Sequence, residues 1–492
     1  MRHKFFLLIV LAIVIIAFST PARAAPDAIL VVNNASDKIL GVCDASHCTL
    51  REAILASNAT ADVVDTIQFN IPNTSALCDA ATHVCTIQAQ TALPEITAPV
   101  VIDGYSQPGA QPNTLQVGND AALKIVLDGS ATTDAHGLDI QGGNSTIKGL
   151  VIVGFDEFGI LVRTANDVIE GNWIGIAADG VTAQGNTLGM GISGHNHRIG
   201  GTTPAARNVV SGVQAVGILV EAASTISIQG NYIGTGAQGS TAIGNGVGIL
   251  VAFGNHVTIG GTDKRARNVI SSNLTAGITL NQTTNALVQN NFIGTDPTGK
   301  HPLGTQGIGI EISSGEATSE SRNNIITRNR IAFHAENGIQ VRLYSYNTFI
   351  SRNTIHSNGG LGINLGTDGI TFNDDAAALD ADEGANHLQN FPVLSSAQSS
   401  GGTTTIQATL RAAAKQDYRI EFFSGACNGD SPFNYGEGKK YLGAVDVKTN
   451  AQGKATFTFT KNKPIAVNTA ITATATDNLG NTSEFSKCKA VQ

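Results

Sequence analysis

The sequence predicts an all-β fold: a right-handed parallel β-helix with an N-terminal capping helix and a C-terminal immunoglobulin-like β-sandwich. Seven copies of the triplet Asn-x-Ile or Asn-x-Val form a regular series, in which successive copies lie 36, 23, 37, 23, 38 and 24 residues apart. Such a period indicates one unit stacked on itself, a solenoid. The 55 glycines and the charged fraction of 14% favour turn-rich strands over helices. The copies begin at Asn172, Asn208, Asn231, Asn268, Asn291, Asn329 and Asn353.

Residues 1–24 have the pattern of a signal peptide. Arg2 and Lys4 form a basic start, an apolar run of 14 residues follows over 5–18, and Ala22-Arg23-Ala24 is a small-x-small cleavage site. The alternative is an uncleaved anchor, but the run is shorter than the roughly 20 residues that span a bilayer. We therefore expect export to the cell surface, the medium or the periplasm, with no membrane span after cleavage.

The charge of the chain bears on its partners. Removing Arg2, Lys4 and Arg23 with the leader leaves 27 of the 30 basic residues against 38 acidic ones, a net charge of about −11. This balance argues against nucleic acid or an anionic membrane as the main partner.

Six cysteines follow the leader, and an exported chain favours disulfides. A metal site is the alternative, but His47 and His83 do not stand at zinc-finger spacing. Proximity predicts the pairs Cys43–Cys48, Cys78–Cys85 and Cys427–Cys488.

Residues 25–64 are predicted to form an N-terminal cap. Thr49-Leu50-Arg51-Glu52 is a capping box, in which Thr49 accepts from the backbone N–H of Glu52 and the Glu52 carboxylate reaches back. Apolar residues then recur on one helical face. The open end of a solenoid must be covered, and this helix is placed to cover it.

Residues 65–392 are predicted to form the parallel β-helix. Each turn reads as three short strands, and the later turns open with Gly-Ile. A helical repeat is excluded, because alternating patterning and high glycine content destabilise helices. Each triplet asparagine is expected to take the left-handed bend between two sheets and to bond to the next asparagine along the stack.

An acidic run near the end of this segment offers oxygen ligands that suit Ca²⁺, with a solvated acidic linker as the alternative. The candidate ligands are Asp368, Asp374, Asp380 and Asp382. Residues 393–492 then show alternating strands at hairpin spacing, which predicts the β-sandwich.

Cys48-Thr49-Leu50-Arg51-Glu52-Ala53-Ile54 closely resembles the Cys-Ser-Leu-Arg-Glu-Ala motif that opens a family of exported bacterial β-helix proteins, with Thr49 where serine is usual. The resemblance extends through 65–72, 102–109, 230–235, 387–392 and 476–485. It implies a pectin-lyase-like fold and export. It implies no agreed reaction, so no catalytic residue follows from it.

The middle residue of each triplet should face solvent, because the isoleucine faces the core. Aromatic rings then fall on alternate turns, and arginines precede several of the asparagines. Extra loops at 176–185, 235–244 and 295–304 would form a wall beside them. The arrangement resembles a groove for an extended, acidic glycan. Its candidate residues are Trp173, Tyr232, Phe292, Arg207, Arg267 and Arg328.

The alternative for this face is that the loops pack over the rings while the arginines pair with carboxylates such as Asp179 and Asp296. Enzymes with this fold need clustered carboxylates, and no aspartate pair recurs on adjacent turns. We therefore expect a surface or secreted protein that binds glycan without catalysis. The alternatives are a polysaccharide lyase or glycoside hydrolase, and a structural spacer or adhesin stalk.

Overall fold

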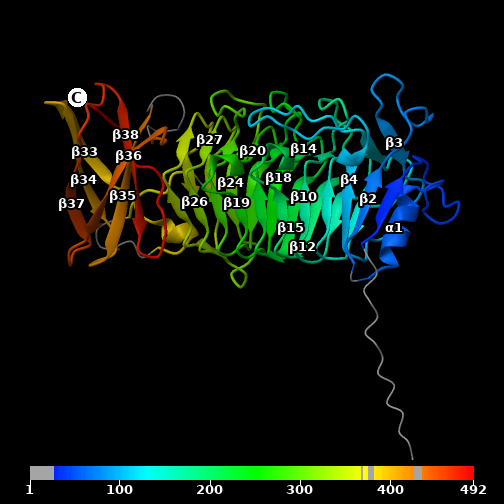
Figure 1. Cartoon of the computed structure of the whole chain (residues 1–492). Helices are drawn as coiled ribbons and strands as arrows, with labels where there is room; N and C mark the ends of the chain where they lie inside the picture. Colours follow the sequence, from blue (N-terminus) through cyan, green and yellow to red (C-terminus); the bar gives the residue numbers. More distant parts are fainter. Residues whose placement is uncertain (1–26, 62, 367–368, 375–381, 426–434) are drawn as a thin grey trace, which may run out of the picture.

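The computed structural model describes residues 27–61, 63–366, 369–374, 382–425 and 435–492, so the expected leader lies outside the described residues. The chain forms an elongated stack that runs from the N-terminal cap to a sandwich of antiparallel strands (Figure 1). One α-helix, α1 (Leu50–Asn58), is found in the described part of the chain. No described helix is long and apolar enough to cross a membrane.

The stack is a parallel β-helix, because three parallel sheets run its length and each turn contributes a strand to each sheet in the regular part. Sheet A contains β1 (Ile29–Val32), β2 (Asp65–Phe69), β4 (Val100–Asp103), β7 (Thr146–Lys148), β10 (Val168–Glu170), β13 (Arg198–Gly200), β16 (Ser227–Gln229), β19 (Thr258–Gly260), β22 (Leu287–Gln289), β26 (Ile325–Thr327) and β30 (Phe349–Ser351). Sheet B contains β3 (Cys85–Gln88), β5 (Ile125–Asp128), β8 (Leu150–Val153), β11 (Trp173–Ile174), β14 (Val209–Val210), β17 (Tyr232–Ile233), β20 (Val269–Ile270), β23 (Phe292–Ile293), β27 (Arg330–Ala332) and β31 (Thr354–His356). Sheet C contains β6 (Leu138–Ile140), β9 (Phe158–Val162), β12 (Leu188–His195), β15 (Val216–Ser224), β18 (Val247–Ala252), β21 (Ala276–Asn281), β24 (Ile308–Ser313), β28 (Ile339–Val341) and β32 (Ile363–Leu365).

Shorter elements decorate the turns. They are the strand pair β25 (Ser321–Arg322) and β29 (Ser345–Tyr346), and the 3₁₀ turns η1 (Gly104–Ser106), η2 (Pro204–Ala206), η3 (Lys264–Ala266) and η4 (Ala385–Leu388).

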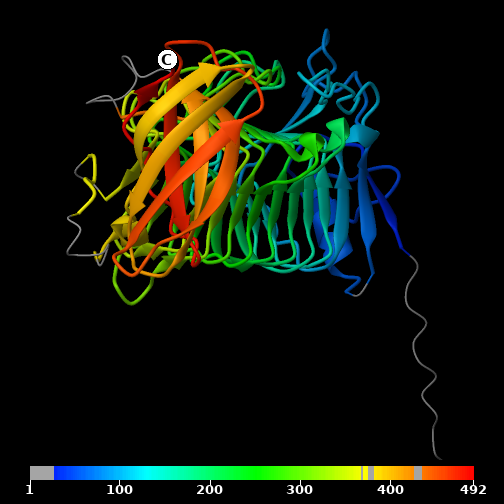
Figure 2. The ribbon, with the colours of Figure 1, turned by 90° about the vertical axis from the view of Figure 1, so that its left-hand side faces the viewer.

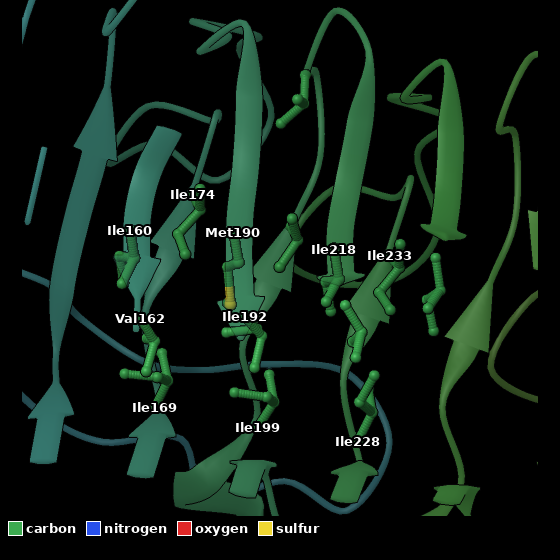
Figure 3. Close-up of a cluster of buried hydrophobic side chains, with 14 of the residues drawn as sticks. Ile160, Val162, Ile169, Ile174, Met190, Ile192, Ile199, Ile218, Ile228 and Ile233 are labelled. Carbon is green, nitrogen blue, oxygen red and sulfur yellow. The ribbon is translucent and has the colours of Figure 1, made fainter. Parts of the chain in front are cut away.

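The core is a column of branched side chains that all three sheets supply (Figure 3). Ile160 comes from sheet C, Ile169 from sheet A and Ile174 from sheet B, and each is fully buried. Because strands of successive turns pair in register, the same position is apolar again in the next turn, as in Ile174 beside Val210 and Ile160 beside Met190. The repeat in the sequence is therefore the repeat of this core.

The triplet asparagines form a buried ladder. The side-chain amide of Asn231 donates to Oδ1 of Asn268 at 3.1 Å, and Asn268 donates to Asn291 at 2.9 Å. Each Oδ1 also accepts a backbone N–H, such as that of Asn231 on Asn268 Oδ1. The predicted amide ladder is thus present. The expected left-handed bend at these asparagines is wrong, because none of the seven has a positive φ. In five of the seven turns the bend lies one residue earlier, at positions such as Gly230 (φ 70°) and Arg328 (φ 56°), whereas Arg207 and Arg267 have φ of −65° and −63°.

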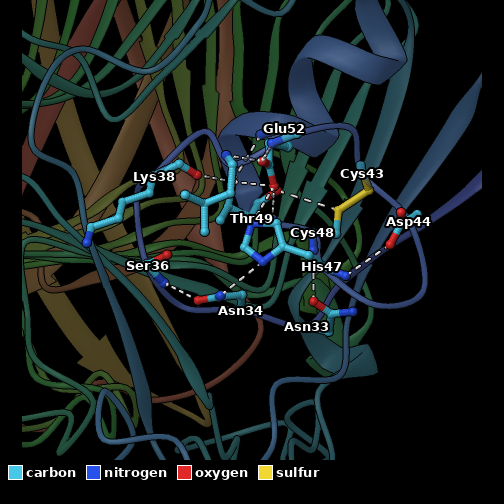
Figure 4. A network of polar contacts seen from close by, with 12 residues as sticks. Asn33, Asn34, Ser36, Lys38, Cys43, Asp44, His47, Cys48, Thr49 and Glu52 are labelled. Carbon is cyan, nitrogen blue, oxygen red and sulfur yellow. Dashed lines mark hydrogen bonds and ion pairs between the residues drawn. A yellow bond between two sulfur atoms is a disulfide. The ribbon is translucent and has the colours of Figure 1, made fainter.

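The N-terminal cap is built around the buried carboxylate of Glu52 (Figure 4). The predicted capping box is complete: Thr49 accepts from the Glu52 N–H, and Glu52 accepts from the Thr49 N–H. Glu52 also accepts the N–H groups of Leu40 and Gly41. Burial alone would raise its pKa, but these donors and the nearby His47 lower it overall. The helix is therefore tied to the segment before it.

The sandwich has two antiparallel sheets (Figure 2). One contains β33 (Val393–Ser400), β34 (Thr403–Arg411) and β37 (Lys454–Lys461), and the other β36 (Lys440–Lys448), β35 (Asp417–Gly425), β38 (Ala470–Asp477) and β39 (Lys489–Ala490). Phe422 stacks on Phe459 in their shared core, with ring centroids 4.5 Å apart.

Buried carboxylates of the sandwich cover the last turn of the solenoid. Glu421 accepts the N–H of Arg352, Glu437 accepts that of Ser357, and Glu484 accepts that of Leu365, at 2.7–2.9 Å. These three donors belong to the last turn, whose backbone N–H groups would otherwise face an absent neighbour. The sandwich therefore replaces the next turn of the stack.

Two of the expected disulfides are present, Cys43–Cys48 and Cys78–Cys85. Cys488 is also disulfide-bonded, and its expected partner Cys427 lies outside the described residues.

Candidate functional site

The outer face of sheet B carries the three extra loops foreseen from the sequence. Each loop is closed by an antiparallel bridge, as between Thr235 and Ala242. Each also places a glycine with φ near 70° against the ring of its own turn. A Cβ on Gly180, Gly239 or Gly299 would lie 3.3, 2.9 or 2.7 Å from the nearest ring atom of Trp173, Tyr232 or Phe292, respectively. The loops therefore lie on top of the rings and not beside them.

This packing removes two of the three rings from solvent. Trp173 is 5% exposed and Tyr232 is 2% exposed, whereas Phe292 is half-buried. Trp173 and Tyr232 form a hydrophobic cluster with Val209, Val269 and others, separate from the core inside the solenoid. The expectation that these rings face solvent is wrong. They point away from the core as predicted, but the loops cover them.

A further segment crosses the same face. Residues 113–119, here called the strap, are held against Tyr232, whose hydroxyl accepts the N–H of Gly118 at 3.0 Å. Gln238 in the second loop accepts the N–H of Asn119 at 3.3 Å. The strap follows β4 in sequence, yet it lies over strands several turns further along the stack.

Arg207 clamps the strap. Its guanidinium lies 4.3 Å from the centroid of the Tyr232 ring, and it donates to the carbonyls of Leu115 at 3.1 Å, Gln116 at 2.8 Å, and also Gly118. A fourth bond goes to the carbonyl of Gly230, and burial lowers the pKa of the guanidinium. The backbone carbonyls occupy most of its donors, so Arg207 positions the strap.

Arg267 lies over the next ring. Its guanidinium is 3.9 Å from the centroid of Phe292, and Nε and Nη2 donate to the carbonyl and side-chain oxygen of Asn290 at 2.9 and 2.6 Å. Burial, together with the nearby Arg330, lowers its pKa. Arg328 is exposed on the turn where the chain bends left-handedly.

The alternative for this face is confirmed for the loops, which pack over Trp173 and Tyr232, but its pairing of the arginines with Asp179 and Asp296 is not what the structure shows. Asp179 accepts from Thr182 at 2.5 Å, and Asp296 pairs with His301 at 3.0 Å. Each carboxylate organises the turn of its own loop.

Several cations converge on a cavity of about 210 Å³, here called the basic pocket. Lys264 and Arg265 reach it from η3, and Arg265 is paired with Asp263 at 2.6 Å. Hydrogen bonds from Arg265 lower the pKa of Asp263 to about 2. The lining residues are Gln116, Val117, Arg207, Tyr232, Lys264, Arg265, Arg267, Val269 and Pro297. Four cations thus surround one small cavity in a chain whose net charge is −8.

The structure brings three of the six predicted residues into this pocket, Arg207, Tyr232 and Arg267. It leaves Trp173, Phe292 and Arg328 outside the lining. Sequence reasoning missed Lys264, Arg265 and the strap. A signal for the first two was available: Gly261–Asn268 repeats Gly201–Asn208, with Asp263-Lys264-Arg265 replacing Thr203-Pro204-Ala205.

Only two of the four candidate calcium ligands in the acidic run lie within the described residues. Asp368 and Asp380 lie outside the described residues. Asp374 accepts the side-chain amide of Asn390 at 2.6 Å, and burial together with Asp374 raises the pKa of Asp382. Within the described ranges, no three His, Cys, Asp or Glu side chains gather closely enough to hold a metal ion.

The histidines of the turn at 194–198 form no open site. His197 and Asp167 are both buried, 3.4 Å apart, and Nδ1 of His197 accepts the N–H of Asp167 at 3.1 Å. Burial lowers the pKa of His197 and raises that of Asp167, so the histidine is neutral.

No protein-family model matches the chain. Among solved structures, it is similar to the enzymatically active domain of tailspike protein 2 of bacteriophage CBA120, with 11% identity over 95% of this chain and 77% of that chain, at a TM-score of 0.31. It is also similar to tailspike gp49 of Acinetobacter baumannii bacteriophage Fri1, a capsular polysaccharide depolymerase, with 8% identity over 87% and 76% of the chains, at a TM-score of 0.17. Similarity this weak carries no argument about substrate or reaction. The fold and the site themselves define a capped parallel β-helix protein with a basic surface pocket.

Proposed function

We propose that this protein is an exported, non-catalytic glycan-binding protein that recognises an acidic sugar unit in the basic pocket. The observation that carries the proposal is the convergence of Lys264, Arg265 and Arg267 on one small cavity. Arginine and lysine recognise carboxylate and sulfate groups through charge-assisted hydrogen bonds. Export follows from the pattern of residues 1–24.

The pocket offers apolar surface for a sugar ring as well as cations for the acidic group. Pro297, Val269 and, from the strap, Val117 supply apolar surface beside the cations. Sites for small ligands combine apolar walls with a few polar groups that set orientation. Arg207 keeps the strap in place, so the wall is formed before the ligand arrives.

The composition of the lining favours binding over hydrolysis. Glycoside hydrolysis uses two carboxyl groups on either side of the bond that breaks. The described lining of the basic pocket contains no Asp or Glu, and Asp263 beside it is held by Arg265. A polysaccharide lyase or hydrolase remains the alternative and would release new chain ends from a bound polymer.

The test is retention of the purified protein on immobilised polygalacturonate. We expect the double variant Lys264→Ala/Arg265→Ala to bind at least tenfold more weakly with an unchanged Tm, because both side chains lie on an exposed turn. Lys439→Ala/Lys440→Ala removes the same charge from the sandwich and should bind like the wild type. Equal retention of the first variant and the wild type would overturn the proposal, and release of unsaturated or reducing ends would identify an enzyme.

A further inference from the structure

A second and larger cavity lies toward the N-terminal end of the same face of sheet B. Its volume is about 760 Å³, within the range of small-ligand sites, and we call it the apolar pocket. Three segments form its walls: residues 76–86, residues 121–124, and the start of the first loop at 177–179. Most of the lining is aliphatic, and it includes Leu77, Val84, Ala122, Leu123 and Ala177.

The walls are fixed to one another. The disulfide Cys78–Cys85 closes the first segment, and Nζ of Lys124 donates to the carbonyl of Thr82 at 2.7 Å, which joins the first wall to the second. Ala122 is held in a two-way backbone bridge with Gln111. A pocket whose walls are already joined loses little freedom when a ligand enters.

The charge at this pocket is opposite in sign to that at the basic pocket. Asp79 and Asp179 stand at the rim, and hydrogen bonds from Thr82 and Thr182 lower their respective pKa values. Both carboxylates are therefore ionised at neutral pH, and the described lining contains one ammonium group, that of Lys124. An acidic sugar unit would be repelled here, whereas the hydroxyl groups of an uncharged unit can donate to the carboxylates.

We infer that the apolar pocket holds an uncharged sugar unit of the same glycan whose acidic unit occupies the basic pocket. The ligand is then a heteropolysaccharide with both kinds of unit, and not a uniformly acidic polymer. This inference rests on the proposed function, since it assigns a second subsite to the same ligand. The C–H face of the ring packs on Leu77 and Val84, and its hydroxyls meet Asp79.

The distance between the pockets sets the length of the ligand. Lys124 precedes β5, Arg267 precedes β20, and five strand steps separate them in sheet B. At about 4.8 Å a step, the span is about 24 Å, which requires a chain of several sugar units. The strap lies between the two pockets and exposes Leu115 and Val117, which are 40% and 59% exposed. These side chains provide apolar surface along the path.

The experiment compares binding of two size-matched probes, long hyaluronan fragments, in which acidic and uncharged units alternate, and polygalacturonate fragments. Ala122→Trp fills the apolar pocket, and Val467→Trp places the same ring on an exposed site of the sandwich as a control. We expect the wild type to bind hyaluronan more tightly than polygalacturonate. Ala122→Trp should lose at least tenfold in hyaluronan affinity and keep its polygalacturonate affinity. Val467→Trp should bind both probes like the wild type. In Asp79→Asn/Asp179→Asn, which keeps the turn-forming side-chain oxygens, polygalacturonate should bind more tightly.

Each failure has its own signature. If Ala122→Trp and the double asparagine variant both bind the two probes like the wild type, the second subsite is overturned and the basic pocket stands. If Lys264→Ala/Arg265→Ala binds both probes like the wild type, the proposed function fails, and the second subsite fails with it. A wild type that prefers polygalacturonate would overturn the heteropolysaccharide assignment alone.

Discussion

The regular stacking of the turns depends on buried polar side chains, each of which bonds to the next turn. An unpaired buried amide would cost about 1–3 kcal/mol, so a column of asparagines is tolerated only because each one satisfies its neighbours. Asn231 donates to Asn268 and to the carbonyl of Ile199, which closes the corner between sheets A and B. A second ladder of side-chain amides runs along the other side of sheet B, where Asn245 donates to Asn273 and Asn273 donates to Gln306.

This second ladder contains one titratable member, His334, and it makes stability depend on pH. The ring is buried beside the side-chain amide of Gln306, the backbone N–H of His334 donates to Asn358 Oδ1, and burial lowers the pKa of the ring from 6.5 to about 3. The unfolded chain takes up a proton below pH 6.5 while the folded chain does not. Stability is therefore unaffected above pH 6.5 and falls between pH 6.5 and 3, by up to about 5 kcal/mol.

The check is His334→Gln, which continues the ladder with an amide and cannot titrate. We expect its Tm to fall less than that of the wild type as the pH is lowered from 7 to 4. The exposed His195→Gln serves as the control and should follow the wild type. A Tm of His334→Gln that falls as steeply as the wild-type Tm would contradict the assignment.

Among the elements of the fold, the loops on sheet B determine which side chains of the site are covered. Rings that the strand pattern directs outward are covered because each loop brings a glycine down onto its own ring. Gly239 has φ near 74°, and a Cβ there would overlap Pro297 and lie 2.9 Å from Tyr232. The second loop is therefore the element that links the buried ring to the basic pocket.

Gly239→Ala tests this packing. Left-handed strain costs about 1–2 kcal/mol and overpacking adds about 1–3, so we expect a loss of about 3 kcal/mol, read as a lower Tm, together with weaker glycan binding. Gly402→Ala has a similar backbone, φ near 83°, with open space around it, and should show the strain alone. Equal losses for the two variants would show that the loop does not press on the ring.

Across the whole molecule, the two ends of the solenoid are closed in different ways. Glu52 holds the N-terminal cap together by accepting the N–H groups of Leu40, Gly41 and Thr49. At the other end, Glu421, Glu437 and Glu484 of the sandwich accept N–H groups of the last turn. Unpaired strand edges are templates for pairing with another chain. The sandwich thus covers the edge of the last turn and prevents that edge from pairing with another chain.

Glu437→Ala should expose that edge. Its carboxylate accepts the N–H of Ser357 at 2.7 Å and both the N–H and side-chain amide of Asn358. Leaving these buried donors unpaired costs about 1–3 kcal/mol each. We expect a lower Tm and a mass in light scattering that rises with concentration, whereas the exposed Glu316→Ala should remain like the wild type. An unchanged Tm would show that the carboxylate is dispensable.

The architecture of this protein could be predicted from its sequence, because the local signals agree with one another. Asn-x-Ile triplets, Gly-Ile starts and the capping box each specify a local geometry, and repetition makes that geometry add up to a stack. The isoleucines of the triplets are buried, the amides form a ladder, and Thr49 caps α1, all as their residue types require.

The side chains that the outer face of sheet B presents to solvent depend on contacts between segments far apart in the sequence. Strand alternation tells which side chains leave the core, but not what covers them. The strap meets Arg207 across about ninety residues of sequence, and no local pattern encodes such a contact. Lys264 and Arg265 likewise become a site only where they meet Arg267, the strap and the third loop. The candidate site therefore depends on long-range packing, while the fold that supports it depends on short-range repetition.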